Sequence, residues 1–178
     1  MPAPLPTLRV ALRSTRAMNL TMPKLDIPVV RTALHLPVSD EPPTAAEYHV
    51  EQMGDAAFDW IIAEIRGERL TVAETAKGLR LLSMLTRQHC LPRKGELLDL
   101  MIALASSPTA HVDVRSTAAH IAGGQVAIAK GLGPANAERC YGRAQATIET
   151  QVTTALQCAI GLGLAKDTEP FVRTWLRR

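Results

Sequence analysis

The sequence has few aromatic residues, and that shortage limits how its core can be built. Only 3% of the 178 residues are Phe, Trp or Tyr, although 47% are hydrophobic. The interior must therefore consist mainly of Leu, Ile, Val, Met and Ala, which is typical of closely packed helices. Sandwiches and barrels depend more on aromatic and β-branched side chains. The composition thus predicts an all-α protein.

Cysteines and long apolar runs are also scarce. Cys90, Cys140 and Cys158 are the only cysteines, and none belongs to a C-x-x-C pair. An odd, dispersed set argues against a disulfide framework and favours a reducing compartment. No apolar run approaches the roughly 20 residues that span a bilayer, and the N-terminus lacks the apolar core of a secretory signal. We therefore expect a cytoplasmic protein without a membrane span.

Residues 1–43 differ from the rest in their proline content. Eight of the 12 prolines fall there, and they forbid a long helix across most of the segment. Arg9, Arg13 and Arg16 lie between these prolines, with no acidic residue before Asp26. The segment could be a disordered tail, a mitochondrial transit peptide or an arm that docks on a partner. We favour an extended arm that either docks on a partner or lines the protein's own helical stack; a transit peptide would place the protein in the mitochondrion.

Residues 44–178 show a continuous helical pattern and are expected to form one domain. Thr44 with Glu47, and Thr71 with Glu74, have the spacing of capping boxes that open helices. Apolar residues then recur at intervals of three and four, and a glycine at position 54 is expected to break or kink the first helix. Short helices are predicted to begin near 55, 94 and 136, and longer ones near 72, 112 and 151. Both series step by about forty residues, as HEAT and armadillo repeats do.

One segment resembles the HEAT family. Ser107-Pro108 and the run Val112–Ile121, which contains Asp113 and Arg115, are similar to its signature of a proline-marked turn, an acidic-Val-Arg run and alanines. The resemblance implies a short α-solenoid of about three antiparallel helix pairs, in which Asp113 and Arg115 tie adjacent repeats together. The signature is clear in this repeat alone. A TPR-like array and an irregular helical bundle are the alternative folds.

No motif for catalysis, metal binding or a cofactor stands out. His89 and Cys90 are adjacent, and neighbouring helical residues point about 100° apart, which does not suit a shared metal. The glycines complete no phosphate-binding loop. Gly123 and Gly163 lie forty residues apart, and we interpret them as equivalent points of close helix packing in two repeats.

Charge is distributed unevenly along the chain. Between residues 75 and 95 the sequence has five basic residues and no acidic one, whereas residues 40–55 hold five acidic residues and no Lys or Arg. The basic segment is either a solvated helix face or a docking surface for an acidic partner or for phosphates. No aromatic residue interleaves it, which argues against base stacking on single strands. Its members are Lys77, Arg80, Arg87, Arg93 and Lys94.

The resemblance implies a non-catalytic scaffold or adaptor that binds another protein, as part of a complex, through the solenoid surface and the N-terminal arm. The alternative is a HEAT-like protein that binds nucleic acid through the basic stripe at residues 77–94. We expect no enzymatic activity, no cofactor and no metal.

Overall fold

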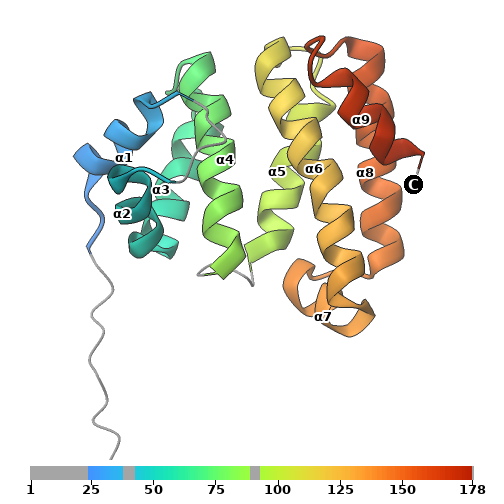
Figure 1. The fold of residues 1–178 in the computed structure, drawn as a ribbon, viewed down its shortest axis with the longest axis horizontal. Coiled ribbons are helices and arrows are strands. Elements are labelled where there is room, and N and C mark those ends of the chain that lie inside the picture. The colour runs from blue at the N-terminus through green and yellow to red at the C-terminus, as the bar shows by residue number, and fades with distance from the viewer. Residues whose placement is uncertain (1–23, 38–42, 89–92, 178) are drawn as a thin grey trace, which may run out of the picture.

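The computed structural model describes residues 24–37, 43–88 and 93–177. Within these residues the protein is all-α, with nine helices and no strand (Figure 1). In chain order the helices are α1 (Ile27–His35), α2 (Ala45–Met53), α3 (Asp55–Arg66), α4 (Val72–Gln88), α5 (Lys94–Ala105), α6 (Val112–Leu132), α7 (Pro134–Tyr141), α8 (Gln145–Leu162) and α9 (Glu169–Leu176).

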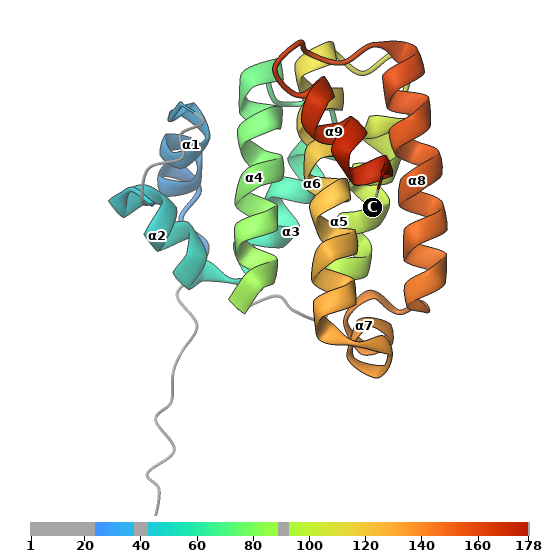
Figure 2. The ribbon, with the colours of Figure 1, turned by 45° about the vertical axis from the view of Figure 1, so that its right-hand side comes forward.

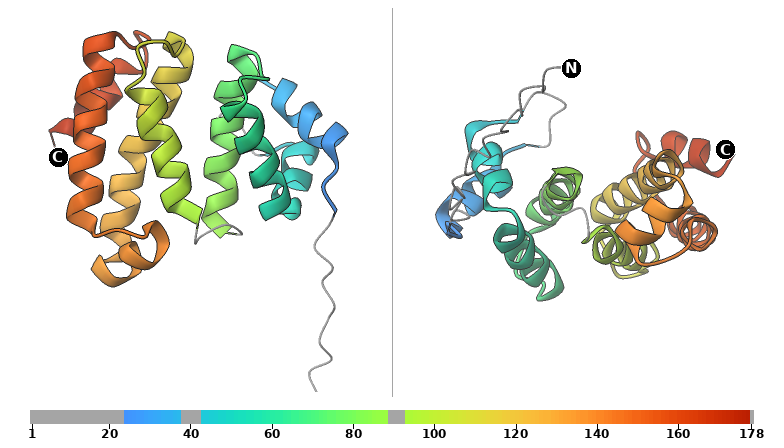
Figure 3. Two further views of the ribbon diagram at one scale, coloured as in Figure 1. Left: turned by 180° about the vertical axis from the view of Figure 1, so that it is seen from behind. Right: turned by 90° about the horizontal axis from the view of Figure 1, so that it is seen from below.

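The long helices organise the packing. Helix α6 contacts α4 on one side and α8 on the other, and the three run side by side (Figure 1). Helices α3 and α5 pack against α4 and α6 and come to the front when the molecule is seen from behind (Figure 3). Helix α9 folds back over α6 and α8 (Figure 2). This arrangement leaves one broad face that is made by α4, α6, α8 and α9.

The segment 1–43 is not extended throughout, because residues 27–35 form helix α1. Pro28 falls in the first turn, where a helix needs no donor from that position. The Asp26 carboxylate caps the same turn by accepting a hydrogen bond from the Val29 amide at 3.2 Å. Val30, Ala33 and Leu34 are buried against α2 and α4. Residues 27–35 of the segment that was expected to be extended are therefore helical and packed on the following helices. Arg9, Arg13 and Arg16 lie outside the described residues.

Both predicted capping boxes are confirmed. The Thr44 hydroxyl accepts from the Glu47 amide at 3.3 Å, while the Glu47 carboxylate accepts from the Thr44 amide at 2.7 Å. Thr71 and Glu74 repeat the pattern at 3.3 and 2.8 Å. Gly54, with φ of 54°, separates α2 from α3. A left-handed residue of this kind is where glycine is favoured, so the predicted break lies where the sequence put it.

The last helix pair differs from the sequence prediction. Helices α3, α4, α5 and α6 begin at 55, 72, 94 and 112, as expected. A short helix was also expected to begin near 136, with the next helix opening near 151. Instead α7 ends at Tyr141, because Gly142 adopts the left-handed conformation with φ of 67°, and α8 begins at Gln145. The step from α6 to α8 is thus 33 residues and not about forty.

A single aliphatic core runs through all the described helices, from Val30 in α1 to Val172 in α9. Helix α5 is buried on more than one side, as its apolar composition predicts. Phe58 and Tyr141 are the buried aromatic residues of the described chain. Tyr141 needs a polar partner, and its hydroxyl donates to the side-chain oxygen of buried Gln125 at 2.7 Å. This bond joins α7 to α6.

Candidate partner-binding surface

The five basic residues of the predicted stripe do not form one surface. Lys77 and Lys94 are buried, with 5% and 3% of their surface exposed, and Arg93 is partly covered. Arg80 and Arg87 are the two that are exposed on α4. The expected exposed stripe is therefore reduced to these two arginines, because the other three side chains are used inside the protein.

Lys77 bridges α4 to the N-terminal helices. Its ammonium group donates to the Glu47 carboxylate on α2 and to the Pro37 carbonyl at 3.1 Å. Burial by itself would raise the pKa of Glu47, but the hydrogen bonds from Lys77 and Thr44 outweigh it and hold that pKa below its usual value. The pair is an internal contact.

Arg93 has the same kind of role between α3 and α5. Its guanidinium donates at 2.6 Å to Asp59 and to Glu96, approaches Asp55 at 3.7 Å, and lies 4.0 Å from the centre of the Phe58 ring. Burial would lower the pKa of this guanidinium, but the carboxylates of Glu96 and Asp59 raise it. Lys77 and Arg93 thus have carboxylate partners inside the fold, and two of these partners, Glu47 and Asp55, come from the acidic segment of the sequence.

Lys94 contacts no carboxylate among the described residues. Burial lowers the pKa of its ammonium group, the charge of Arg87 lowers it further, and the nearby Cys140 opposes this effect. A desolvated cation of this kind is not available to a partner that approaches from solvent.

Arg115 joins α6 to the end of α8. Its guanidinium donates to the carbonyls of Leu162 at 3.1 Å and Gly163 at 2.8 Å, and also to those of Ser107 and Ala110. These bonds satisfy carbonyls that a helix end and a turn leave without partners. Arg115 therefore connects the start of α6 to the end of α8.

Asp113 does not share this role among the described residues. Its carboxylate is exposed and lies 3.5 Å from His111 within the first turn of α6. At the start of a helix an acidic side chain complements the helix dipole. The geometry thus assigns a local effect to Asp113 and a linking contact to Arg115.

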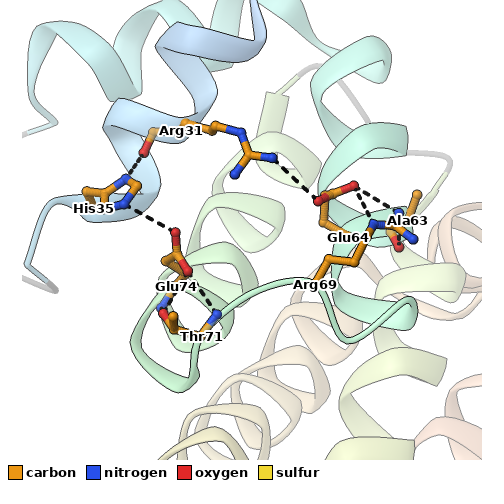
Figure 4. A network of polar contacts seen from close by, with 7 residues as sticks. All are labelled: Arg31, His35, Ala63, Glu64, Arg69, Thr71 and Glu74. Atoms are coloured by element: carbon orange, nitrogen blue, oxygen red, sulfur yellow. Dashed lines mark hydrogen bonds and ion pairs between the residues drawn. The ribbon is translucent and has the colours of Figure 1, made fainter.

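Side-chain polar contacts join the N-terminal helix α1 to α3 and α4. Figure 4 shows Arg31 reaching Glu64 at 3.9 Å and His35 reaching Glu74 at 3.4 Å. Arg69 also pairs with Glu64, at 2.9 Å. Hydrogen bonds from Thr71 lower the pKa of Glu74, and the charges of His35 and Arg31 add to this. The network shows that α1 is part of the folded body.

Helix α9 lies on the broad face and rests on a glycine. A Cβ atom at Gly123 would lie well inside contact distance of the Trp175 ring, so only glycine lets α9 approach α6 this closely. Phe171 of α9 packs edge-on against His120, with ring centres 6.1 Å apart. Gly163 has another role: with φ of 95° it ends α8. The predicted equivalence of Gly123 and Gly163 was therefore wrong.

A hollow of about 350 Å³ continues from the end of α9 along the groove between α6 and α8. We call it the α6–α8 hollow. Lys130 and Glu149, from opposite sides, form an ion pair at 3.7 Å. Its remaining lining is mostly apolar, and the full set is Gly123, Val126, Ala127, Lys130, Glu149, Val152, Thr153, Leu156, Trp175 and Leu176.

A second hollow of about 210 Å³, the α4–α6 hollow, lies on the other side of α6. Within the described chain Arg80 and Arg87 make no ion pair there, and Ile128 is 37% exposed. Trp175 lines this hollow as well as the first. The lining residues are Arg80, Ser83, Arg87, His120, Ile121, Gly124, Gln125, Ile128 and Trp175.

Sequence reasoning missed Trp175 and Ile128. Helix α9 carries Val172, Trp175 and Leu176 at helical spacing, and this pattern indicates a face that packs on other helices. It does not indicate which helices it meets. Ile128 reads as an ordinary core position, and only the packing of α6 leaves it at the surface.

Within the described ranges no group of three or more His, Cys, Asp or Glu side chains could hold a metal ion. In the same residues no helix is long and apolar enough to cross a bilayer. Comparisons with protein-family models, with curated proteins and with solved structures gave no significant match. The function has to be inferred from the fold and from the broad face.

Proposed function

We propose that this protein is a short HEAT-like solenoid that acts as a non-catalytic scaffold, binding another protein through the face made by α4, α6, α8 and α9. The observation that supports this most directly is the pair of adjoining hollows that share Trp175. An aromatic side chain flanked by open, partly apolar recesses is typical of the centre of a protein interface.

The chemistry of the face favours binding over catalysis. Among the described residues the shifted pKa values belong to Glu47, Glu74, Arg93, Lys94 and Tyr141. None of these five residues lines either hollow. Each has a structural explanation in burial or in a hydrogen bond, whereas an active site usually brings such groups together in a cleft.

Nucleic-acid binding through residues 77–94 has weaker support. Only Arg80 and Arg87 of the five basic residues are exposed, and the hollow between them is partly apolar. Phosphate-backbone binding requires several exposed cations along one track. A protein partner fits this surface better.

Site-specific photo-crosslinking in the native host tests the proposal. A crosslinking residue is introduced at Ile128 or Thr153 on the broad face, and at Ala103 on α5 as the control, since all three are exposed. We expect a discrete adduct from the first two positions and none from the third. Adducts of equal yield from Ala103, or none from the broad face, would contradict the proposal.

A further inference from the structure

Two arginines on the broad face are uncompensated by any acid in the described chain. Most other described arginines, among them Arg31, Arg66 and Arg143, contact a carboxylate. Arg80 and Arg87 make no ion pair with another described residue, although both are exposed and line the α4–α6 hollow. The α4–α6 hollow therefore carries two exposed guanidinium charges that no described carboxylate pairs.

The two arginines have a defined spacing. They are seven residues apart on α4, which is about two turns and about 10.5 Å along the axis. Seven residues correspond to nearly whole turns, so both side chains leave the same face of the helix. Ser83 lies between them on that face and also lines the hollow. Two anionic groups on a facing helix would need the same seven-residue spacing.

The lining between the arginines is open and partly apolar, since His120 and Gln125 belong to it as well as two isoleucines. These are Ile121 and Ile128 of α6, and Trp175 of α9 lies at the border with the α6–α8 hollow. At Gly124 an added Cβ would have no atom within 4 Å, so the backbone of α6 is bare at that point. A partner side chain can approach α6 there more closely than over a larger residue.

We propose that the α4–α6 hollow binds an acidic amphipathic helix of a partner protein, with two carboxylates seven residues apart on Arg80 and Arg87. An apolar side chain three or four residues after the first carboxylate lies between them, against Ile128 and Gly124. This is helix-in-groove recognition with charge complementarity at both ends. The inference rests on the proposed function and specifies the chemistry of the partner.

Peptide binding to the full chain measures this directly. Fluorescence anisotropy is recorded with a stapled helical peptide that carries Glu at positions i and i+7 and Leu at i+3 and i+4. A permuted peptide of the same composition places the two Glu side chains on opposite faces. We expect the first peptide to bind at least about tenfold more tightly than the permuted one, and its affinity to fall with salt.

Matched variants separate local contacts from net charge. Arg80→Glu with Arg87→Glu is expected to weaken binding at least about tenfold. Lys24→Glu with Lys166→Glu makes the same change in net charge at two exposed positions away from the hollow, and its affinity is expected to stay within about twofold. Circular dichroism and thermal melting verify that each variant is folded. If the double variant Arg80→Glu with Arg87→Glu unfolds, the charge-neutral pair Arg80→Gln with Arg87→Gln takes its place.

Three outcomes would overturn the inference. If a peptide with Gln in place of Glu binds equally well, and Trp175→Ala abolishes binding, the proposed function stands and the acidic partner is wrong. If no peptide binds but a DNA duplex does, in a way that depends on Arg80 and Arg87, both proposals fail. If the two double variants weaken binding equally, the attraction is nonspecific and the hollow is not the site.

Discussion

Gly123 and Gly124 are adjacent on α6, yet their surroundings differ. A methyl group at Gly123 would collide with Trp175, while at Gly124 it would meet open space. Either substitution by alanine raises helix propensity by about 1 kcal/mol. We expect Gly124→Ala to stabilise the protein by about 0.5–1 kcal/mol and Gly123→Ala to displace the end of α9.

Tryptophan emission and melting distinguish the two variants. The chain has two tryptophans, so a Trp60→Phe background leaves Trp175 as the reporter. Emission is expected to shift to the red in Gly123→Ala, where the ring is pushed into solvent, and to stay unchanged in Gly124→Ala. Equal emission from both variants would show that α9 does not rest on Gly123.

The buried pair of Lys77 and Glu47 makes stability depend on pH. Lys77→Met leaves the Glu47 carboxylate partly buried without its cation. We expect the free energy of unfolding to fall by about 2–4 kcal/mol at pH 7. The matched control is Arg80→Met, which removes an exposed cation from the same helix that has no ion pair among the described residues. It is expected to cost less than about 0.5 kcal/mol.

At acid pH the wild type and Lys77→Met should differ less in their free energy of unfolding. In the wild type the pKa of Glu47 is below its unfolded value of 4.5. Its contribution is therefore complete above that pH and is lost as the pH falls through the folded pKa. In Lys77→Met the hydrogen bond and charge of Lys77 no longer counteract the effect of burial, so the pKa of Glu47 rises. The carboxylate is therefore protonated at a higher pH than in the wild type. Urea unfolding at pH 7 and pH 4 measures the difference in the free energy of unfolding between the two proteins. The same difference at both pH values would show that the Lys77–Glu47 pair is not its cause.

At the level of elements, α1 is the helix that the sequence analysis did not predict. Prolines at 28 and 37 suggested an extended chain, but they fall in the first turn of a nine-residue helix and just beyond its end. Neither position interrupts the helix. The role of α1 comes from buried Val30, Ala33 and Leu34 and from its ion pairs with α3 and α4.

Two truncations test whether α1 is structural. Deleting residues 1–37 removes the buried side chains of α1, and we expect the free energy of unfolding to fall by about 3–5 kcal/mol. Deleting residues 1–23 retains every contact of α1 described here and is expected to leave the melting temperature nearly unchanged. Equal melting temperatures for both truncations would show that α1 contributes no stability. A docking role for Arg9, Arg13 and Arg16 stays a prediction, which partner binding by the shorter truncation tests.

For the whole molecule, local signals in the sequence determined much of the fold. The aliphatic composition, the capping boxes at Thr44 and Thr71 and the break at Gly54 all depend on interactions within a few residues, and all were predicted. The start of α8 was missed, because Gly142 looks like any other glycine until the backbone turns left-handed there. Helical periodicity continues across such a glycine and conceals the end of a helix.

What the sequence could not determine is which charges face each other. The basic run at 77–94 and the acidic run at 40–55 look like two partner surfaces. Packing of α2 and α3 against α4 and α5 pairs Lys77 and Arg93 with acids from the N-terminal helices. Arg80 and Arg87 remain exposed, and α9 brings Trp175 beside them. Helix identity is a local property, whereas burial and charge pairing depend on contacts between residues distant in sequence, so only the tertiary structure decided the candidate surface.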